Sequence, residues 1–182
     1  MMWESCGRVG FGYASHVVPW VDCHPSPTGP PPGEQECIMP DIVTEPAWVI
    51  DVASATRDEI LENLVALMAP RLGDLQPGRV LQAILQRERQ CPTVVDVQLA
   101  VPHARLPGLS GYHIGLARVR QGVEFAPGKR VRMVCMLIGP DGNQKQYLDV
   151  LAAILRLFQD KGGKLLRMKP NQAAALLALS KA

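Results

Sequence analysis

Beyond Met39, the apolar residues follow two spacings, one typical of strands and one typical of amphipathic helices. The run from Trp48 to Val52 predicts a short strand. Thr56 and Glu59 have the spacing of a capping box, in which each side chain accepts a hydrogen bond from an otherwise unpaired backbone amide at a helix start. The helix that follows places five apolar residues on one face: Ile60, Leu61, Leu64, Val65 and Met68. Pro70 and Gly73 are expected to end it.

A second helix is predicted from Pro77 to Glu88, because proline suits the first turn of a helix. An apolar stripe runs along it: Val80, Leu81, Ile84 and Leu85. The spacing then changes, and the segment from Val95 to Val101 alternates like one strand with a single buried face. Pro102 is expected to stop this strand, which leaves His103 just past its end.

The second half of the chain continues the interleaving of strands and helices. Strands are predicted at 115–119 and 130–138, followed by a turn at 139–142 and a helix at 147–158. The residues expected to face inward from this helix are Leu148, Leu151, Ile154, Leu155 and Phe158. We expect Gly162 and Gly163 to break the helix, Leu165 and Leu166 to form a last short strand, and Asn171 to cap a terminal helix. This order predicts a single compact α/β domain, with a mixed sheet of about five strands flanked by helices.

Residues 1–38 have a different composition from the rest of the chain. They hold 6 of the 16 prolines and show neither the strand spacing nor the helix spacing of apolar residues. They also lack the basic segment followed by an apolar one that a signal peptide would have. We interpret them as a disordered extension, or as the result of a gene start placed too early, with Met39 the true first residue. The predicted domain is then 39–182, with 18 basic and 13 acidic residues and a net charge of +5.

Composition excludes several classes of function. The 182 residues suit one domain, and a net charge of +2 with 5% aromatic residues argues against nucleic acid as a partner. No run of about 18 apolar residues occurs, so no membrane insertion is expected. Five cysteines without a Cys-x-x-Cys pair favour a reduced, cytoplasmic protein, with Cys135 as a buried thiol. The spacing of Cys6, Cys23, His24 and Cys37 fits no zinc finger, so no metal site is predicted.

Common catalytic signatures are absent. The segment 122–130 looks like a phosphate-binding loop, but it has one intervening residue too many and Arg130 where Ser or Thr is required, so a turn between strands is the better interpretation. There is also no nucleophile elbow, no zinc-protease helix and no dinucleotide fingerprint.

What remains is His103, which directly follows a proline at a predicted sheet edge. A neutral imidazole keeps one ring nitrogen unprotonated near pH 7 and can act as a nucleophile. If it accepted a phosphoryl group, Arg105 and Arg87 are the nearby candidates to balance the new negative charge. The alternative is a loop histidine that only hydrogen-bonds to the backbone.

Several motifs occur in an order that resembles a known family. Arg87-Glu88, the later Pro92-Thr93 and the run Pro102-His103-Ala104-Arg105 are similar to the type-2 IIA domain of the sugar phosphotransferase system, the fructose/mannitol family that includes nitrogen-regulatory IIA proteins. Further matches are the Gly-Val-acidic-Phe turn at 122–125, the apolar strand at 134–140 and the helix start at 147–152. The resemblance covers about residues 46–182.

The resemblance implies a specific activity. His103 would take a phosphoryl group from the phosphocarrier HPr and pass it to a IIB domain, which phosphorylates incoming sugar, whereas regulatory members signal by their phosphorylation state. Arg87 would lie near the phosphohistidine. The implied protein is a bacterial cytoplasmic phosphotransferase that uses no metal and no other cofactor, because the donor already carries an activated phosphoryl group.

Two places depart from the family pattern, the small-residue preference broken at Cys91-Pro92 and, more importantly, Tyr147. Transport members usually have a second histidine where this chain has Tyr147, and His113 is the only other histidine of the domain. A phenol cannot shuttle protons near neutral pH as an imidazole can. This favours a regulatory role slightly over sugar transport and leaves a second hypothesis open, a non-catalytic IIA-like module that regulates a transporter or kinase by binding. On the phosphocarrier hypothesis, the Tyr147 side chain is expected to lie beside His103.

Overall fold

The computed structural model describes residues 47–53, 55–96 and 98–178. The expected tail at 1–38, its cysteines and the boundary at Met39 lie outside the described residues and stay predictions.

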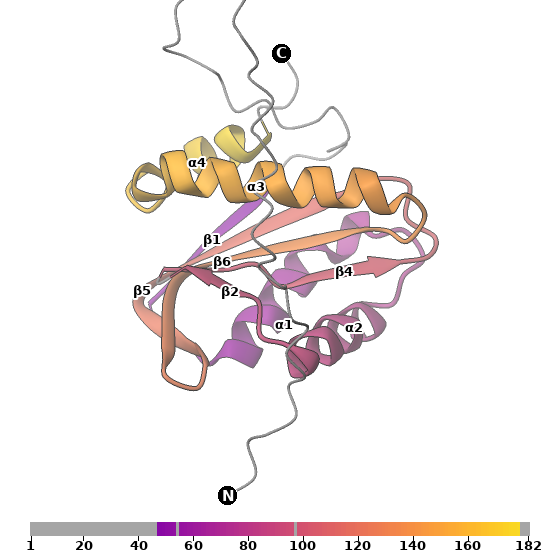
Figure 1. The fold of residues 1–182 in the computed structure, drawn as a ribbon, viewed down its shortest axis with the longest axis horizontal. Helices are drawn as coiled ribbons and strands as arrows, with labels where there is room; N and C mark the ends of the chain where they lie inside the picture. The colour runs from indigo at the N-terminus through magenta and orange to yellow at the C-terminus, as the bar shows by residue number, and fades with distance from the viewer. Residues whose placement is uncertain (1–46, 54, 97, 179–182) are drawn as a thin grey trace, which may run out of the picture. The chain divides into compact units, whose positions relative to one another are not determined.

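A six-stranded mixed sheet forms the centre of the domain (Figure 1). The strands are β1 (Trp48–Val52), β2 (Val94–Asp96), β3 (Leu99–Ala100), β4 (His103–Leu106), β5 (His113–Ala126) and β6 (Lys129–Pro140). Their order is β1-β5-β6-β3-β2, and β4 also pairs with β6. The β1–β5, β3–β6 and β4–β6 pairs are parallel, whereas β5–β6 and β2–β3 are antiparallel. The predicted α/β class with a mixed sheet is confirmed.

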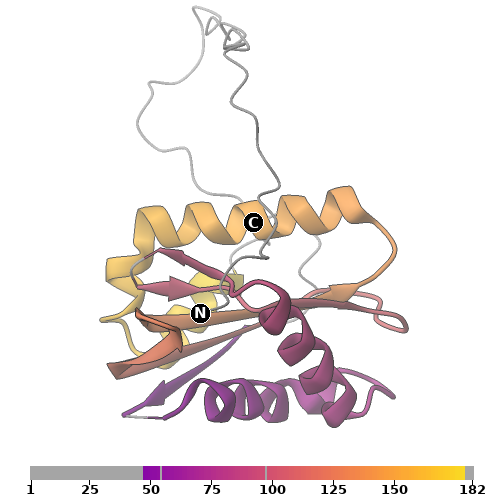
Figure 2. The same cartoon turned by 60° about the horizontal axis from the view of Figure 1, so that its bottom comes forward.

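Helices cover both faces of the sheet. The elements are α1 (Arg57–Met68), a short 3-10 helix η1 (Ala69–Arg71), α2 (Pro77–Gln90), α3 (Gln144–Leu165) and α4 (Pro170–Ala178). In Figure 2, α3 crosses one side of the sheet while α1 and α2 lie on the other. The buried residues Ala173 and Leu177 of α4 join the same core as α3.

Two hydrophobic cores result, one on each face of the sheet, and β6 contributes to both by alternation from Met133 to Ile138. Cys135 and Leu137 face α3, whereas Val134 and Met136 face α1 and α2. Complete burial raises the pKa of the Cys135 thiol to about 12, so this thiol packs as a small apolar group, as expected.

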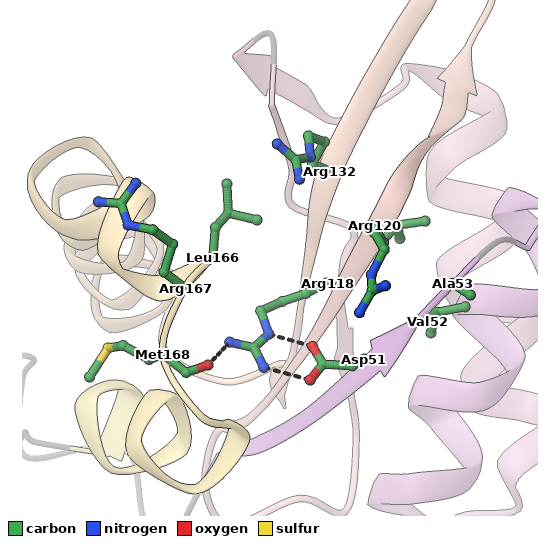
Figure 3. A pocket seen from close by; sticks show the side chains of 10 residues that line it. Asp51, Val52, Ala53, Arg118, Arg120, Arg132, Leu166, Arg167 and Met168 are labelled. Atoms are coloured by element: carbon green, nitrogen blue, oxygen red, sulfur yellow. Dashed lines mark hydrogen bonds and ion pairs between the residues drawn. The ribbon is translucent and has the colours of Figure 1, made fainter.

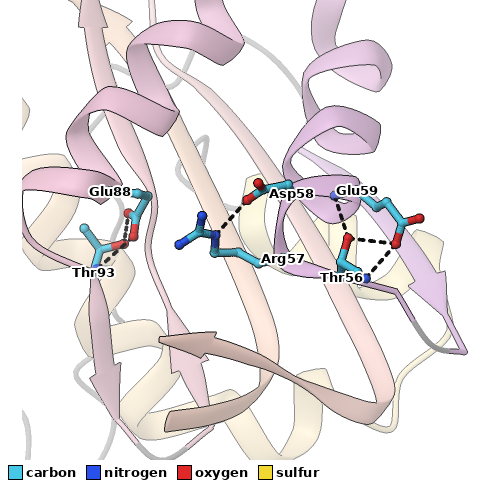
Figure 4. Close-up of polar contacts among 6 residues, drawn as sticks. All are labelled: Thr56, Arg57, Asp58, Glu59, Glu88 and Thr93. Atoms are coloured by element: carbon cyan, nitrogen blue, oxygen red, sulfur yellow. Dashed lines mark hydrogen bonds and ion pairs between the residues drawn. The ribbon is translucent and has the colours of Figure 1, made fainter. Parts of the chain in front are cut away.

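Local sequence signals set the helix starts. The Thr56 hydroxyl accepts a hydrogen bond from the Glu59 amide, and the Glu59 carboxylate accepts one from the Thr56 amide, which confirms the capping box (Figure 4). Pro77 occupies the first turn of α2. The Asn143 side chain caps α3 by accepting a hydrogen bond from the Gln146 amide, a cap that the sequence analysis did not foresee.

The prediction of one strand from Val95 to Val101 is wrong. The structure has two short strands there, β2 and β3, which pair with each other in antiparallel fashion. A single strand of this alternation would place the Val95 side chain on the buried face, but at this edge Val95 is 50% exposed. The chain therefore turns back near Gln98, and its carbonyl accepts hydrogen bonds from the Arg132 and Met133 amides of β6.

Four predictions about the C-terminal part are also wrong. Helix α3 runs through Gly162 and Gly163 to Leu165, because a glycine pair weakens a helix but cannot end one that packs on a core. Leu165 and Leu166 consequently form no strand. Leu148 points outward and is 51% exposed, whereas Tyr147 takes the buried position beside it. Helix α4 begins at Pro170, one residue before the predicted cap Asn171.

Strands β3 and β4 lie one after the other along the same edge of β6, and this arrangement positions the candidate histidine. Between them, the Pro102 carbonyl accepts a hydrogen bond from the Leu137 amide, so the chain stays beside β6 although proline has no amide to donate. His103 is thus the first residue of β4, where a loop position was expected. None of the described helices is long and apolar enough to cross a membrane.

Candidate active site

The imidazole of His103 is fixed by one hydrogen bond. Its Nδ1 atom lies 2.8 Å from the carbonyl oxygen of Val101. A carbonyl can only accept, so Nδ1 carries the proton of the neutral ring and Nε2 keeps a free lone pair. The side chain is half-buried. The geometry therefore presents Nε2 as the reactive atom.

The surroundings favour the neutral form of this ring. Burial lowers the pKa of His103 below its usual 6.5, and the nearby Arg87 charge lowers it further, although the Val101 carbonyl and Glu88 act in the opposite direction. The unprotonated form consequently dominates at neutral pH.

A pocket of 420 Å³ brings His103 together with the other three predicted site residues, Arg87, Arg105 and Tyr147. It lies at the β4 edge of the sheet, between the last turns of α2 and the first turn of α3. Arg87 is held by a hydrogen bond from its Nη1 to the Cys91 carbonyl oxygen, at 2.9 Å. The remaining lining residues are Ala83, Gln86, Gln90, Ala104, Asp141, Gln144 and Leu148.

Tyr147 lies directly beside the histidine. The two ring centroids are 6.0 Å apart, and the Cζ atom of Arg105 lies 5.5 Å from the Tyr147 ring centroid. The residue is 5% exposed, and its hydroxyl has no hydrogen-bond partner among the described residues. Burial raises the pKa of Tyr147 well above its usual value of about 10, so the phenol keeps its proton.

Glu88 and Thr93 hold the backbone that carries the histidine. The buried Glu88 carboxylate accepts hydrogen bonds from both the amide and the hydroxyl of Thr93 (Figure 4). The Thr93 carbonyl accepts from the Val101 amide, and the Val101 carbonyl accepts from His103. A chain of hydrogen bonds thus runs from α2 to the imidazole. The motif suggested these residues, but their positioning role emerges only from the fold.

His113 does not join the site. It pairs with Ile138 of β6, whose side chain belongs to the core under α1 and α2, whereas His103 pairs with Leu137 on the α3 face. Since paired residues of neighbouring strands share a face, the two histidines lie on opposite sides of the sheet.

Tyr112 is a residue that sequence reasoning missed. It is fully buried, and its ring centroid lies 6.2 Å from that of Tyr147. It packs on Gly139, where an added Cβ would lie 2.4 Å from the ring. The sequence around Tyr112, which directly precedes β5, gave no signal for this contact, because Gly139 of β6 lies far away along the chain.

The arrangement can accept and hold a negatively charged group on a nucleophilic nitrogen. Two guanidinium groups and a protonated phenol line the pocket with His103, and the neutral ring supplies the lone pair. Among the described residues, no group of three histidine, cysteine, aspartate or glutamate side chains could hold a metal ion.

Two proteins named for their family roles are similar to this chain in sequence. A nitrogen regulatory protein from Bradyrhizobium diazoefficiens is 31% identical over 123 residues, which cover 66% of this chain and 80% of that protein. A fructose-specific EIIA component of the phosphotransferase system from Haloferax volcanii is 28% identical over 124 residues, or 65% of this chain and 79% of that protein.

Solved structures share the fold. The nitrogen regulatory protein IIA-Ntr from Neisseria meningitidis superposes with a TM-score of 0.64 at 24% identity, covering 72% of this chain and 92% of that one. The Escherichia coli complex of enzyme IIA for mannitol with its phosphorylated enzyme IIB gives 0.56 at 19% identity, covering 74% and 95%. The model of the phosphoenolpyruvate-dependent sugar phosphotransferase system, EIIA 2 family matches residues 42–181. The chain therefore belongs to the EIIA type 2 family of the phosphotransferase system.

Proposed function

We propose that this protein is a cytoplasmic phosphocarrier that accepts a phosphoryl group on Nε2 of His103 from an HPr-like donor. The group then passes to a IIB partner, or its presence signals to a regulated transporter or kinase. The observation that supports this most strongly is the hydrogen bond from Nδ1 to the Val101 carbonyl, because it leaves Nε2 as the free nucleophile at the pocket.

The chemical step is a displacement at phosphorus. The Nε2 lone pair attacks the phosphorus atom of the donor phosphohistidine, the P–N bond of the donor breaks, and the donor imidazole leaves with that electron pair. The neutral His103 needs no base for this attack, because its nucleophilic nitrogen carries no proton. The proton stays on Nδ1 and continues to be donated to the Val101 carbonyl oxygen, which stabilises the positive charge that the ring develops.

The cations of the pocket stabilise the phosphorylated state. A phosphoryl group adds roughly 1.5 to 2 negative charges at pH 7. Arg105 and Arg87 line the pocket with His103, so both guanidinium groups are available to the phosphoryl oxygens. Charge-assisted hydrogen bonds of this kind are about twice as strong as neutral ones.

An apolar surface beside His103 suits a protein donor or acceptor. Leu148 and Val95 are the large apolar residues that are more than a third exposed in the described part of the chain. Leu148 lines the pocket that contains His103, and Val95 lines a smaller one of 210 Å³ that His103 also borders. We place the docking surface for HPr and IIB domains around these two residues.

The test is phosphorylation by a phosphoenolpyruvate-driven HPr relay. Wild type and His113→Ala are expected to gain one acid-labile phosphate, whereas His103→Ala gains none. Acid-labile phosphate in His103→Ala at the wild-type level, or its absence from the wild type, contradicts the proposal.

Tyr147 favours a second candidate function, a IIA-like module that regulates a transporter or kinase by contact alone. A buried phenol at the position of the second family histidine cannot exchange protons with the phosphoryl group. Capture of the partner by His103→Ala and His103→Asp separates the two functions. Equal binding by both variants favours the contact module, and opposite effects favour a switch controlled by phosphorylation.

A further inference from the structure

A second pocket, of 540 Å³, lies at the far end of α3 from His103 (Figure 3). Strands β1 and β5 and the segment after α3 form its walls, and β6 contributes Arg132. The helix axis between Tyr147 and Leu166 spans roughly 28 Å, so this pocket is separate from the candidate active site. No role in phosphoryl transfer to His103 accounts for it.

Arg118 forms a fixed floor for this pocket. It is 6% exposed, and it donates to both carboxylate oxygens of Asp51, at 2.6 and 2.7 Å. It also donates to the carbonyl oxygens of Leu165 and Met168 at the end of α3. Asp51 therefore neutralises Arg118, and these bonds hold the pocket walls in place without a ligand.

Three further arginines line the same pocket: Arg120, Arg132 and Arg167. Each is exposed, and none forms an ion pair or hydrogen bond with another described residue through its side chain. Arg120 comes from β5, Arg132 from β6 and Arg167 from the segment after α3, so three separate elements bring like charges together. Like charges repel one another, and an anion bound between them would relieve that cost.

The pairing of β5 with β6 is irregular at Arg132, because residues 119–122 of β5 lie opposite this one residue of β6, between the pairs Arg118–Met133 and Val123–Val131. The amides of Arg132 and Met133 both donate to the Gln98 carbonyl. Irregularities of this kind re-aim side chains. Met133 belongs to the core under α3, and the lining of the pocket places Arg132 on the same side.

We propose that this pocket binds a small organic anion with at least two phosphate groups, of the size of a nucleoside diphosphate. Guanidinium groups match phosphate oxygens in bidentate geometry, and three of them can neutralise a diphosphate. Pockets of roughly 300–1,000 Å³ hold ligands of this size. Val52, Leu166 and Met168 offer apolar surface for the uncharged part of the ligand. A concave pocket with a buried, pre-ordered floor favours a small molecule over an acidic protein segment, which would need a longer surface.

The test is calorimetric titration of the full chain with inorganic pyrophosphate and with ADP, at constant ionic strength. Arg132→Gln and Arg120→Gln are expected to weaken both ligands about tenfold each, in line with the loss of a charge-assisted contact. Asp51→Asn is expected to strengthen binding, because it removes the negative charge beside the ligand. The matched control is Arg156→Gln, which removes one exposed charge from α3 away from the pocket. It should bind as the wild type does, and thermal unfolding of every variant verifies its fold.

Four outcomes would overturn the proposal. One is the absence of binding up to about 10 mM, tenfold above a Kd of about 1 mM, which already corresponds to weak binding. A second is equal weakening by Arg156→Gln, which would indicate unspecific attraction to positive charge. A third is loss of binding in Arg105→Gln but not in Arg132→Gln, which would place the anion at the His103 pocket. The fourth is binding of a glutamate-rich peptide but not of pyrophosphate, which would indicate an acidic protein partner. None of these outcomes bears on phosphorylation of His103.

Discussion

At the scale of single residues, the protonation of His103 depends on what surrounds it. Burial and the Arg87 charge lower its pKa, whereas the Val101 carbonyl and Glu88 raise it. The neutral ring with a free Nε2 is the form that can attack phosphorus. The direction of the pKa shift therefore favours the proposed activity at neutral and mildly acid pH.

We predict that the imidazole of His103 titrates below pH 6.5 in an NMR pH series, and that Arg87→Gln moves the midpoint upward. A base with a lowered pKa stays neutral as the pH falls through 6.5, so phosphoryl acceptance should decline only at lower pH. Arg156→Gln is the control for the loss of one exposed charge. A midpoint at or above 6.5 in the wild type contradicts this prediction.

A second prediction at this scale concerns Tyr147, whose ring lies 6.0 Å from that of His103. Because the buried phenol keeps its proton, onward transfer from phosphorylated His103 should be slow and the phosphohistidine long-lived. Tyr147→His is expected to speed transfer to a cognate IIB domain. Tyr147→Phe keeps the ring and tests the hydroxyl, and it should change the lifetime of the phosphohistidine. Quench-flow measures the rate of phosphoryl transfer and of phosphohistidine loss in the three proteins. Equal rates in all three would exclude a role for this side chain.

At the scale of elements, the loop between α2 and β2 depends on one buried carboxylate. Glu88 is 1% exposed and accepts two hydrogen bonds from Thr93. Thr93→Val removes the hydroxyl and leaves part of a buried charge without a partner, which should cost about 1–3 kcal/mol of unfolding free energy in urea. Thr93→Ser keeps the hydroxyl and should lose much less. If the two variants are equally unstable, the Thr93 hydroxyl contributes nothing to the free energy of unfolding.

The contact between strands β5 and β6 near the site gives another prediction. A Cβ at Gly139 would lie 2.4 Å from the Tyr112 ring, whereas one at Gly142 would meet nothing within 4 Å. Gly139→Ala should therefore destabilise the domain by roughly 1–3 kcal/mol through overpacking, and Gly142→Ala should have little effect. Denaturant unfolding of both variants provides the comparison, and a neutral Gly139→Ala would mean that Tyr112 can move aside at no cost.

Some helix and strand boundaries could be predicted from the sequence, and others could not. The capping box at Thr56 and the proline at Pro77 act within one turn, so local sequence was enough to predict two helix starts. The segment 95–101 was misread because alternation cannot distinguish one strand from two short ones that pair with each other. Helix α3 continues past Gly162 because its packing on the core, which depends on residues distant in the sequence, outweighs the low helix propensity of glycine.

The residues of the candidate site could be predicted from the sequence, but their contacts could not. The order of motifs selected His103, Arg87, Arg105 and Tyr147, and all four line one pocket. The hydrogen bond from His103 to Val101 and the contact of Tyr112 with Gly139 depend on strand register, which the sequence does not reveal. The exposure of Leu148 was missed for a similar reason, since the helix could have presented either of two neighbouring residues to the core.

At the scale of the whole molecule, the candidate site lies at the β4 edge of the sheet, where an exposed apolar residue borders the reactive histidine. Leu148→Ser should raise the KM for phosphorylated HPr several-fold, because burial of apolar surface is the main favourable term in most protein–protein association. The pKa of His103 should not change, which separates docking from chemistry. Arg156→Ser on the same helix is the control, and an unchanged KM in Leu148→Ser would place the docking surface elsewhere.

The central claim is that Nε2 of His103 carries the phosphoryl group. Long-range proton–nitrogen NMR of the protein after phosphorylation by the HPr relay identifies the modified ring nitrogen directly. We predict one phosphorylated imidazole, that of His103, with phosphorus on Nε2 and the proton retained on Nδ1. Phosphorus on Nδ1, on another residue, or on none after complete turnover of the donor would contradict it.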